Sequence, residues 1–183
     1  IKPFRIQYYC EKRDPDFEAK MHEVLLVYKQ IEMLFDDNGE LFIPAAEHDV
    51  HTYSYDEKPG IQAISTTGRD LNPTINNGTI KRDYEYKRLG TVSLLAAIDL
   101  ITGKAIPLVR DKHTSNDFID FLKLLNEKYP EGDIIRVILD NHTVHTSKKV
   151  KKFLATMTGR FIFIFTPKHG SWLNMIEGFF GKM

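Results

Sequence analysis

Residues 134–140, with the sequence Ile-Ile-Arg-Val-Ile-Leu-Asp, decide the fold that we expect for this chain. An almost unbroken apolar run of this length is typical of a central strand that is covered on both faces. Gly132 precedes the run and Asp140 ends it, so the strand is predicted to stop at that carboxylate. A strand that is buried on both sides requires helices on both faces of its sheet.

The segments around this strand alternate between helical and extended patterns. Apolar residues at helical spacing predict helices that begin at or just after candidate capping residues, namely Asp14, Ser115, Ser147 and Ser171. Apolar runs and alternations predict further strands over residues 49–55, 92–98, 105–109 and 161–165. The order of these elements predicts an α/β fold, with a mixed five-stranded sheet and helices on both faces.

Two stretches are predicted to interrupt the regular elements. Pro59 and Gly60 follow Asp56 closely, and both residues disfavour strand interiors, so the first strand is expected to end at Asp56. Residues 66–90 are polar and carry several basic side chains, and we interpret them as a long loop that is either functional or disordered.

The composition indicates one globular domain and excludes several classes of protein. Of the 183 residues, 42% are hydrophobic, and 25 Lys and Arg balance 25 Asp and Glu to give zero net charge. This balance argues against binding nucleic acid by charge alone, but it is compatible with an acidic metal site surrounded by basic patches. Cys10 is the only cysteine, which excludes a disulfide framework and favours a reducing compartment. No apolar run approaches the roughly 20 residues of a membrane span.

Three acidic residues lie where a metal site is expected. Asp56 and Asp140 each come at the end of a predicted strand, and Glu177 lies on the last predicted helix among apolar neighbours. Carboxylates at the carboxyl ends of neighbouring strands meet where open α/β sheets usually build their sites. Clustered carboxylates repel one another, and a hard divalent cation such as Mg²⁺ or Mn²⁺ removes that conflict.

Spacing alone leaves other interpretations of the acids open. Asp56 could be a turn residue, and Glu177 could be a solvated helix position. Asp99 is a rival acid, although the residues that follow it indicate a hairpin turn.

The histidines near the predicted strand ends allow a second interpretation. His142, His145 and His169 could bind zinc, but no HExxH pattern is present, so contact with phosphate or support of the acids is favoured. A serine hydrolase is disfavoured, because the chain has no G-x-S-x-G pattern.

Longer motifs are specific enough to indicate a family. They are Ser54-Tyr55-Asp56-Glu57-Lys58-Pro59-Gly60-Ile61-Gln62-Ala63, residues 82–88 and 90–94, Ile138-Leu139-Asp140-Asn141-His142, and Thr166-Pro167-Lys168-His169-Gly170-Ser171-Trp172-Leu173-Asn174-Met175-Ile176-Glu177. These motifs resemble the catalytic blocks of DDE-type transposases of bacterial insertion sequences, which are related to the mariner superfamily. The resemblance runs over most of the chain, and its last block is highly specific.

The resemblance implies a ribonuclease-H-like fold and an enzyme that cuts and rejoins DNA. Asp56, Asp140 and Glu177 would be the catalytic acids and would hold two Mg²⁺ ions, with Asp140 bridging them and Mn²⁺ as a substitute metal. Water would attack a phosphodiester at the transposon end, and the freed 3′-hydroxyl would then attack target DNA. The residues expected to support the acids or to contact DNA are Asn141, His142, Lys168, His169 and Asn174.

The resemblance also implies partners and a domain arrangement. Residues 66–90 occupy the place of a loop that contacts a partner subunit in mariner-like transposases, which predicts a homodimer on transposon-end and target DNA. Residues 1–45 would be a linker and helix leading from a missing helix-turn-helix region. Residues 46–183 would be a catalytic domain that is truncated at its C-terminal end. We therefore expect a bacterial cytoplasmic protein that joins the nucleoid when it acts and has no membrane contact.

Two rival hypotheses remain. One is another nuclease of the same fold, such as a ribonuclease H or a junction resolvase, which the last motif disfavours. The other is a truncated, inactive element product that binds DNA or interferes with an intact transposase. The presence of all three acids argues against that second alternative.

Overall fold

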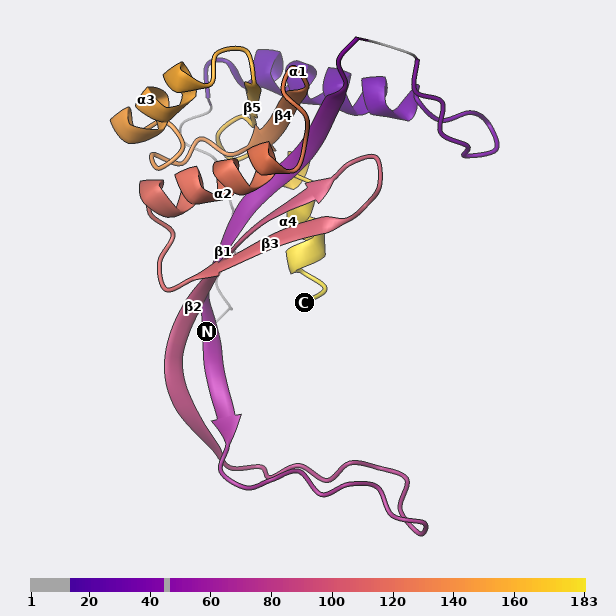
Figure 1. The fold of residues 1–183 in the computed structure, drawn as a ribbon, viewed down its shortest axis with the longest axis vertical. Coiled ribbons are helices and arrows are strands. Elements are labelled where there is room, and N and C mark those ends of the chain that lie inside the picture. Colours follow the sequence, from indigo (N-terminus) through magenta and orange to yellow (C-terminus); the bar gives the residue numbers. More distant parts are fainter. Residues whose placement is uncertain (1–13, 45–46) are drawn as a thin grey trace, which may run out of the picture.

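The computed structural model of the chain describes residues 14–44 and 47–183. Its elements, shown in Figure 1, are α1 (Phe17–Glu32), β1 (Val50–Thr66), β2 (Tyr86–Asp99), β3 (Ala105–Arg110), α2 (Ser115–Glu127), β4 (Ile134–Leu139), α3 (Lys148–Thr156), β5 (Phe161–Phe165), the 3-10 turn η1 (Ser171–Leu173) and α4 (Ile176–Phe180). Cys10 and the predicted domain boundary at residues 45–46 lie outside the described residues. None of the described helices is both long and apolar enough to cross a membrane.

The strands form one mixed sheet in the order β3-β2-β1-β4-β5. β1 pairs antiparallel with β2, and β2 pairs antiparallel with β3, whereas β4 runs parallel to both β1 and β5. An antiparallel meander that continues into parallel strands is the ribonuclease-H-like arrangement. The predicted mixed five-stranded sheet is therefore confirmed.

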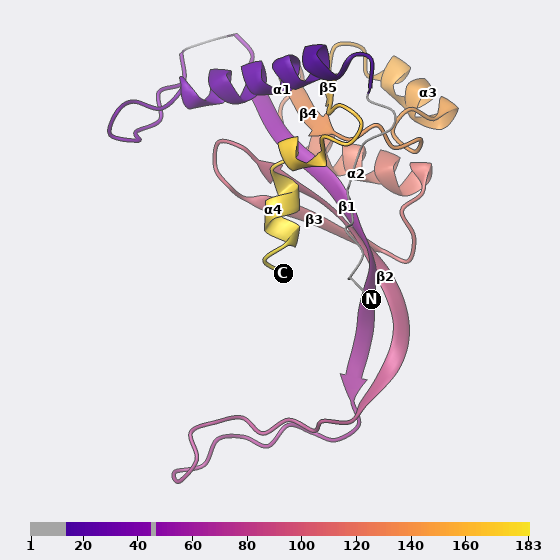
Figure 2. The ribbon, with the colours of Figure 1, turned by 180° about the vertical axis from the view of Figure 1, so that it is seen from behind.

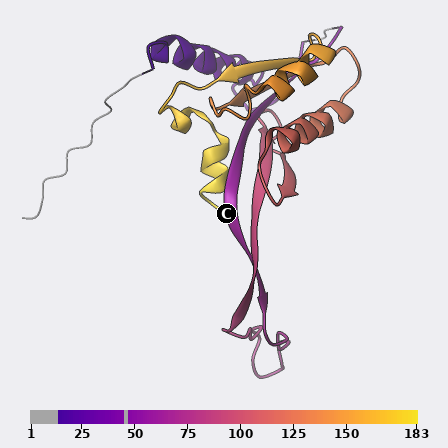
Figure 3. The ribbon, with the colours of Figure 1, turned by 90° about the vertical axis from the view of Figure 1, so that its left-hand side faces the viewer.

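Helices cover both faces of the sheet, as the apolar run at residues 134–139 predicts (Figure 3). Val137 and Leu139 belong to a core cluster with Phe118 of α2. Ile138, which lies between them in β4, belongs instead to a cluster with Val24 of α1. β4 thus contributes side chains to the core on both faces, which explains why nearly all of its residues are apolar.

The prediction that the first strand ends at Asp56 is wrong. β1 continues to Thr66, because β2 begins at Tyr86 rather than at Val92 and pairs with the whole second half of β1. Beyond the edge of the other strands, this pair and its connection form a long projection, residues 61–92, which we call the arm (Figures 1 and 2). The predicted loop at residues 66–90 is therefore mainly the outer part of a hairpin.

A bulge explains how β1 tolerates two strand-breaking residues. The register of β1 against β2 shifts between Lys58 and Ile61, so Pro59 and Gly60 fall where the ladder is already interrupted. Gly60 has a φ of 72°, a left-handed conformation that glycine adopts without steric cost.

The capping residues predicted for α3 and α2 are confirmed only in part. Ser147 caps α3 as predicted, because its side chain accepts a hydrogen bond from the Val150 N–H at 3.4 Å. The prediction for α2 is wrong by one residue: Thr114, not Ser115, is the cap, since Thr114 and Asp117 form a reciprocal capping box.

The first and last predicted helices begin differently from the prediction. Asp14 is not the cap of α1; its carboxylate instead pairs with Lys20 at 2.7 Å and accepts from the Lys168 N–H at 3.1 Å. This contact fastens α1 to the segment that follows β5. Ser171 begins only a short 3-10 turn, and α4 starts at Ile176.

A buried arginine closes the end of α2 that is remote from the predicted site. Arg160 donates to the Oδ1 atom of Asn126 at 2.8 Å and to the carbonyl oxygens of Asn126, Tyr129, Pro130 and Asp133 at 2.9, 2.8, 2.5 and 2.7 Å. Carbonyl groups at a helix end have no partner within the helix. One guanidinium group therefore provides a partner for four carbonyl groups at the end of α2 and in the turn before β4.

Candidate active site

The structure places the three predicted acids around one edge of the sheet. Tyr53 and Tyr55 of β1 point into the core under α2, so Asp56, which alternates with them, points to the opposite face. α4 packs on that face and carries Glu177. Asp140 directly follows β4, which runs parallel to β1.

The pKa of Asp56 depends on its burial and on the acids around it. Burial, and to a smaller extent the negative charges of Glu57, Asp140 and Glu177, together raise the pKa of Asp56 from 3.8 to about 7. A hydrogen bond from the Glu57 N–H at 2.8 Å opposes this rise but does not cancel it. A cation beside these carboxylates would lower the pKa again, because it favours the ionised form.

A buried polar network holds α4 against β1. Ser54 donates to the Oδ1 atom of Asn174, the Asn174 amide donates to the Tyr55 carbonyl at 2.8 Å, and the Ile176 N–H donates to Ser54 Oγ at 2.9 Å. Asn174 is only 2% exposed, so it cannot contact DNA. Its contacts instead fix the start of the helix that carries Glu177.

Asp140 is held by two donors on the segment that follows it. Its Oδ1 atom accepts from the His142 N–H at 2.9 Å and lies 3.1 Å from Nδ1 of His145. Burial would raise the pKa of Asp140, but the hydrogen bonds from His145 and from the His142 N–H outweigh it and lower the pKa below its usual value. The pKa values of Asp140 and Asp56 are therefore shifted in opposite directions from their usual value.

His145 is buried between two acids and cannot meet a phosphate group. Its Nε2 atom lies 2.9 Å from Oε1 of Glu57, which also accepts from the Tyr55 hydroxyl at 2.8 Å. Burial lowers the pKa of His145, but the hydrogen bonds to Asp140 and Glu57 outweigh it and raise the pKa to about 9. Glu57 was not predicted as a site residue, although its position beside Asp56 and on the strand face of Tyr55 is a usable signal.

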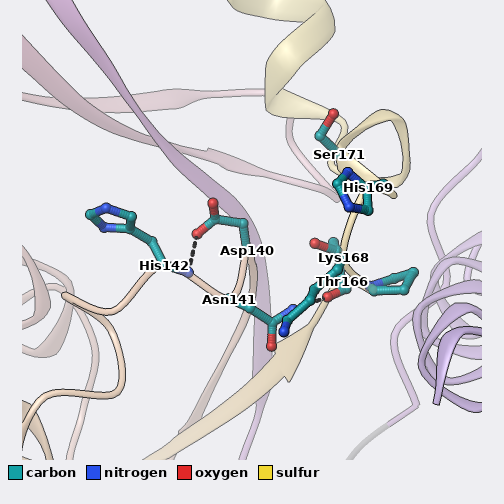
Figure 4. A pocket seen from close by; sticks show the side chains of 8 residues that line it. Asp140, Asn141, His142, Thr166, Lys168, His169 and Ser171 are labelled. Atoms are coloured by element: carbon teal, nitrogen blue, oxygen red, sulfur yellow. Dashed lines mark hydrogen bonds between the residues drawn. The ribbon is translucent and has the colours of Figure 1, made fainter. Parts of the chain in front are cut away.

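A cavity of about 310 Å³ opens beside Asp140 (Figure 4). It is lined by Asp140, Asn141, His142, Thr166, Pro167, Lys168, His169 and Ser171. His142, Lys168 and His169, all predicted to contact DNA or to support the acids, are exposed here. Asn141 is partly buried, and its amide donates to the Thr166 carbonyl, which ties the end of β4 to the end of β5.

A second group of potential metal ligands lies at the other end of β1 and β4. In the part of the chain that the structure describes, only Asp49, His51 and Asp133 place ligand atoms all within 4.8 Å of one another. His51 Nε2 pairs with Asp133 Oδ2 at 2.9 Å, and the Asp49 N–H donates to Asp133 Oδ1 at 3.2 Å, so this group joins the starts of the two strands. No pattern in the sequence predicted this group.

The predicted acids are spaced more widely than that group, as expected for carboxylates that repel one another without a cation. Their donor chemistry nevertheless fits a hard divalent ion, because Asp56, Asp140 and Glu177 offer only carboxylate oxygens.

Replacing Asp56 with asparagine is expected to stabilise the metal-free protein at neutral and alkaline pH. Because folding raises the pKa of this carboxyl from 3.8 to about 7, the native state loses stability as pH rises through this range. Asparagine keeps the oxygen that accepts from the Glu57 N–H and removes the charge. We expect the melting temperature at pH 8 to rise by several degrees, since about 1 kcal/mol corresponds to 2–4 °C in a chain of this size.

The matched control is Asp111→Asn, since Asp111 is exposed. The difference between the Asp56 variant and the wild type should vanish near pH 4. An unchanged melting temperature at pH 8 would show that solvent already relieves the charge of Asp56.

Comparison with known proteins agrees with this arrangement. Residues 53–183 match the family model described as DDE superfamily endonuclease. Over 112 residues, the chain is 30% identical to an uncharacterized 39 kDa protein of insertion element IS630 from Shigella sonnei; the match covers 58% of this chain and 32% of that protein. The chain thus spans about a third of the length of that curated relative.

Two solved structures are similar at low identity. The Mos1 strand transfer complex has a TM-score of 0.45 at 12% identity, over 89% of this chain and 45% of the other. The HTLV-2 integrase catalytic core domain has a TM-score of 0.39 at 15% identity, over 75% and 76% of the two chains. Since the family model matches well over half of its length, the chain belongs to the DDE superfamily endonucleases.

Proposed function

We propose that this chain is the catalytic core of a DNA transposase, in which Asp56, Asp140 and Glu177 hold the divalent cations for strand cleavage and strand transfer. The placement of the three carboxylates carries the proposal, because Asp56 faces the side of the sheet on which α4 bears Glu177, and Asp140 directly follows β4, which runs parallel to β1. Membership of an endonuclease family supports the same assignment. Acids kept in mutual repulsion at a surface edge are suited to binding a cation that relieves the repulsion.

The donor set favours Mg²⁺, with Mn²⁺ as a substitute, because both ions prefer oxygen ligands. When bound, a pair of such ions activates the attacking oxygen and stabilises the leaving oxygen of a phosphodiester. The protein contributes by positioning the carboxylates: the contacts of Ser54 and Asn174 hold the helix of Glu177 on the strand of Asp56.

The proposed substrate is duplex DNA at the transposon end and at the target. Lys168 and His169 are exposed beside Asp140 and are placed to meet phosphate groups. More positive charge is exposed on α3, at Lys148, Lys149, Lys151 and Lys152. These contacts would position the DNA backbone without reading its sequence.

A homodimer on DNA is the proposed assembly, with the arm reaching the partner subunit. The arm exposes large apolar side chains, which water solvates poorly and which a partner would cover: Ile64, Leu71, Ile75, Ile80, Tyr84 and Leu89. The proposed location is the bacterial cytoplasm, at the nucleoid when the protein acts.

Calorimetric titration of Mn²⁺ into the chain, with a short DNA duplex present, tests the proposed function. The wild type should bind Mn²⁺, and Glu177→Gln should weaken binding at least roughly 10-fold, since even outer contacts of a metal site are worth 10–100-fold. Glu131→Gln is the matched control, because Glu131 is an exposed acid in the turn before β4. Wild-type protein that binds DNA but no Mn²⁺ would contradict the proposal and favour an inactive DNA-binding product.

A further inference from the structure

The His145 side chain links Asp140 of the site to its neighbour acid Glu57 from inside the core. It is fully buried, and it lies between Glu57 of β1 and Asp140 after β4. The ring packs against Tyr55 and Phe118, with centroid distances of 5.6 and 4.6 Å. These aromatic neighbours fix the plane of the imidazole, so the ring cannot turn without displacing core side chains.

Both ring nitrogens are used, and each faces a different carboxylate. Nδ1 lies 3.1 Å from Oδ1 of Asp140 and 3.2 Å from the carbonyl oxygen of Asp140. Nε2 lies 2.9 Å from Oε1 of Glu57, and that oxygen also accepts from the Tyr55 hydroxyl at 2.8 Å. The chain Tyr55–Glu57–His145–Asp140 therefore runs from the centre of the sheet to its catalytic edge.

The donors on Asp140 all act on one of its two carboxylate oxygens. Oδ1 takes both the His142 N–H, at 2.9 Å, and the Nδ1 side of the His145 ring. Among the residues that the structure describes, no hydrogen bond reaches Oδ2. In Figure 4 the second oxygen of Asp140 points away from His142.

We propose that His145 is a positioning residue for Asp140: it holds Oδ1 through Nδ1, and Oδ2 is thereby presented to the cation. This inference rests on the proposed function, since it presupposes that Asp140 binds metal. A group that orients a metal-binding side chain in this way typically changes metal affinity by 10–100-fold.

Two substitutions at His145 test the contacts of its two ring nitrogens separately. In asparagine the amide nitrogen is as many bonds from the backbone as Nδ1, so His145→Asn keeps a donor for Asp140 and loses the contact with Glu57. In glutamine the amide nitrogen corresponds to Nε2, so His145→Gln keeps the contact with Glu57 and loses the donor for Asp140. Both variants replace the ring by a neutral amide and open similar space beside Phe118.

The experiment compares Mn²⁺ dissociation constants by calorimetry, with melting temperatures measured on the same samples. We expect His145→Asn to bind Mn²⁺ within a few-fold of the wild type and His145→Gln to bind roughly 10–100-fold more weakly. If His145→Gln does not fold, His145→Phe replaces it, because phenylalanine fills the ring volume without a donor and should show the same loss.

The outcomes distinguish this inference from the proposed function. If His145→Asn and His145→Gln (or His145→Phe) bind Mn²⁺ with equal affinity, the positioning role is overturned. This holds whether both variants keep the affinity of the wild type or both lose it, because replacing a merely structural histidine would affect the two variants alike. Wild-type protein that binds no Mn²⁺ would instead overturn the proposed function, and with it this inference.

Discussion

Replacing Asp140 with asparagine is expected to lower Mn²⁺-dependent nicking of duplex DNA by roughly 10³-fold or more, because a single preorganised electrostatic contact is already worth about 10²–10³ in rate. Asp140 follows the most buried strand of the sheet, and it is the one acid of the three that lines the cavity beside the exposed Lys168 and His169. Asparagine keeps an oxygen for the His142 N–H and removes the charge that would bind the cation. The fold should therefore survive the substitution.

The nicking rate at saturating Mn²⁺ measures this effect, with the melting temperature as a check on folding. Asp99→Asn is the matched control, because Asp99 is the rival acid at the hairpin turn, where its Oδ1 atom accepts from the Ile101 and Thr102 N–H groups at 2.9 and 3.0 Å. If the Asp140 variant nicks DNA at the rate of the wild type, Asp140 does not belong to the active site.

Replacing Arg160 with methionine is expected to destabilise the fold by about 3 kcal/mol or more, because several buried carbonyl groups lose their partner at once. The guanidinium group of Arg160 makes all of its hydrogen bonds to Asn126, Tyr129, Pro130 and Asp133, and the residue is 9% exposed. Methionine fills much of the same space but donates nothing. The melting temperature should fall by roughly 6–12 °C for a chain of this size.

Urea unfolding gives the free energy directly, and Arg88→Met is the control, since Arg88 is exposed on the arm. The control should change the free energy of unfolding by less than about 0.5 kcal/mol, as surface substitutions usually do. A similar small change for Arg160→Met would mean that water replaces the lost hydrogen bonds.

The parts of the fold that depend on local pattern could be predicted from the sequence. The apolar run of β4 and the acid that ends it follow from burial on both faces of the sheet, and the structure has both as expected. Ser147 capped its helix as predicted, because a hydroxyl before a helical pattern acts locally.

The parts that depend on pairing between distant segments could not be predicted. Pro59 and Gly60 predicted the end of a strand. The bulge that accommodates them exists only when β2 is paired with β1, and this pairing is not visible in the local sequence. The contacts of Ser54 with Asn174 and of Glu57 with His145 join residues that are 120 and 88 positions apart. No local pattern indicates such contacts, although each residue stands in or beside a motif that the sequence analysis quoted.

The length of β1 gives the protein a mechanical property. Asp56 and the inner part of the arm belong to one strand, and ten residues of extended chain, about 33 Å, separate Asp56 from Thr66. The arm is therefore a lever whose short end is a proposed metal ligand, and the pairing of β1 with β2 is interrupted between Lys58 and Ile61 and again between Ala63 and Ile64. A force applied to the arm is transmitted along β1 to the backbone of Asp56, except for the part that is absorbed by bending where the pairing is interrupted.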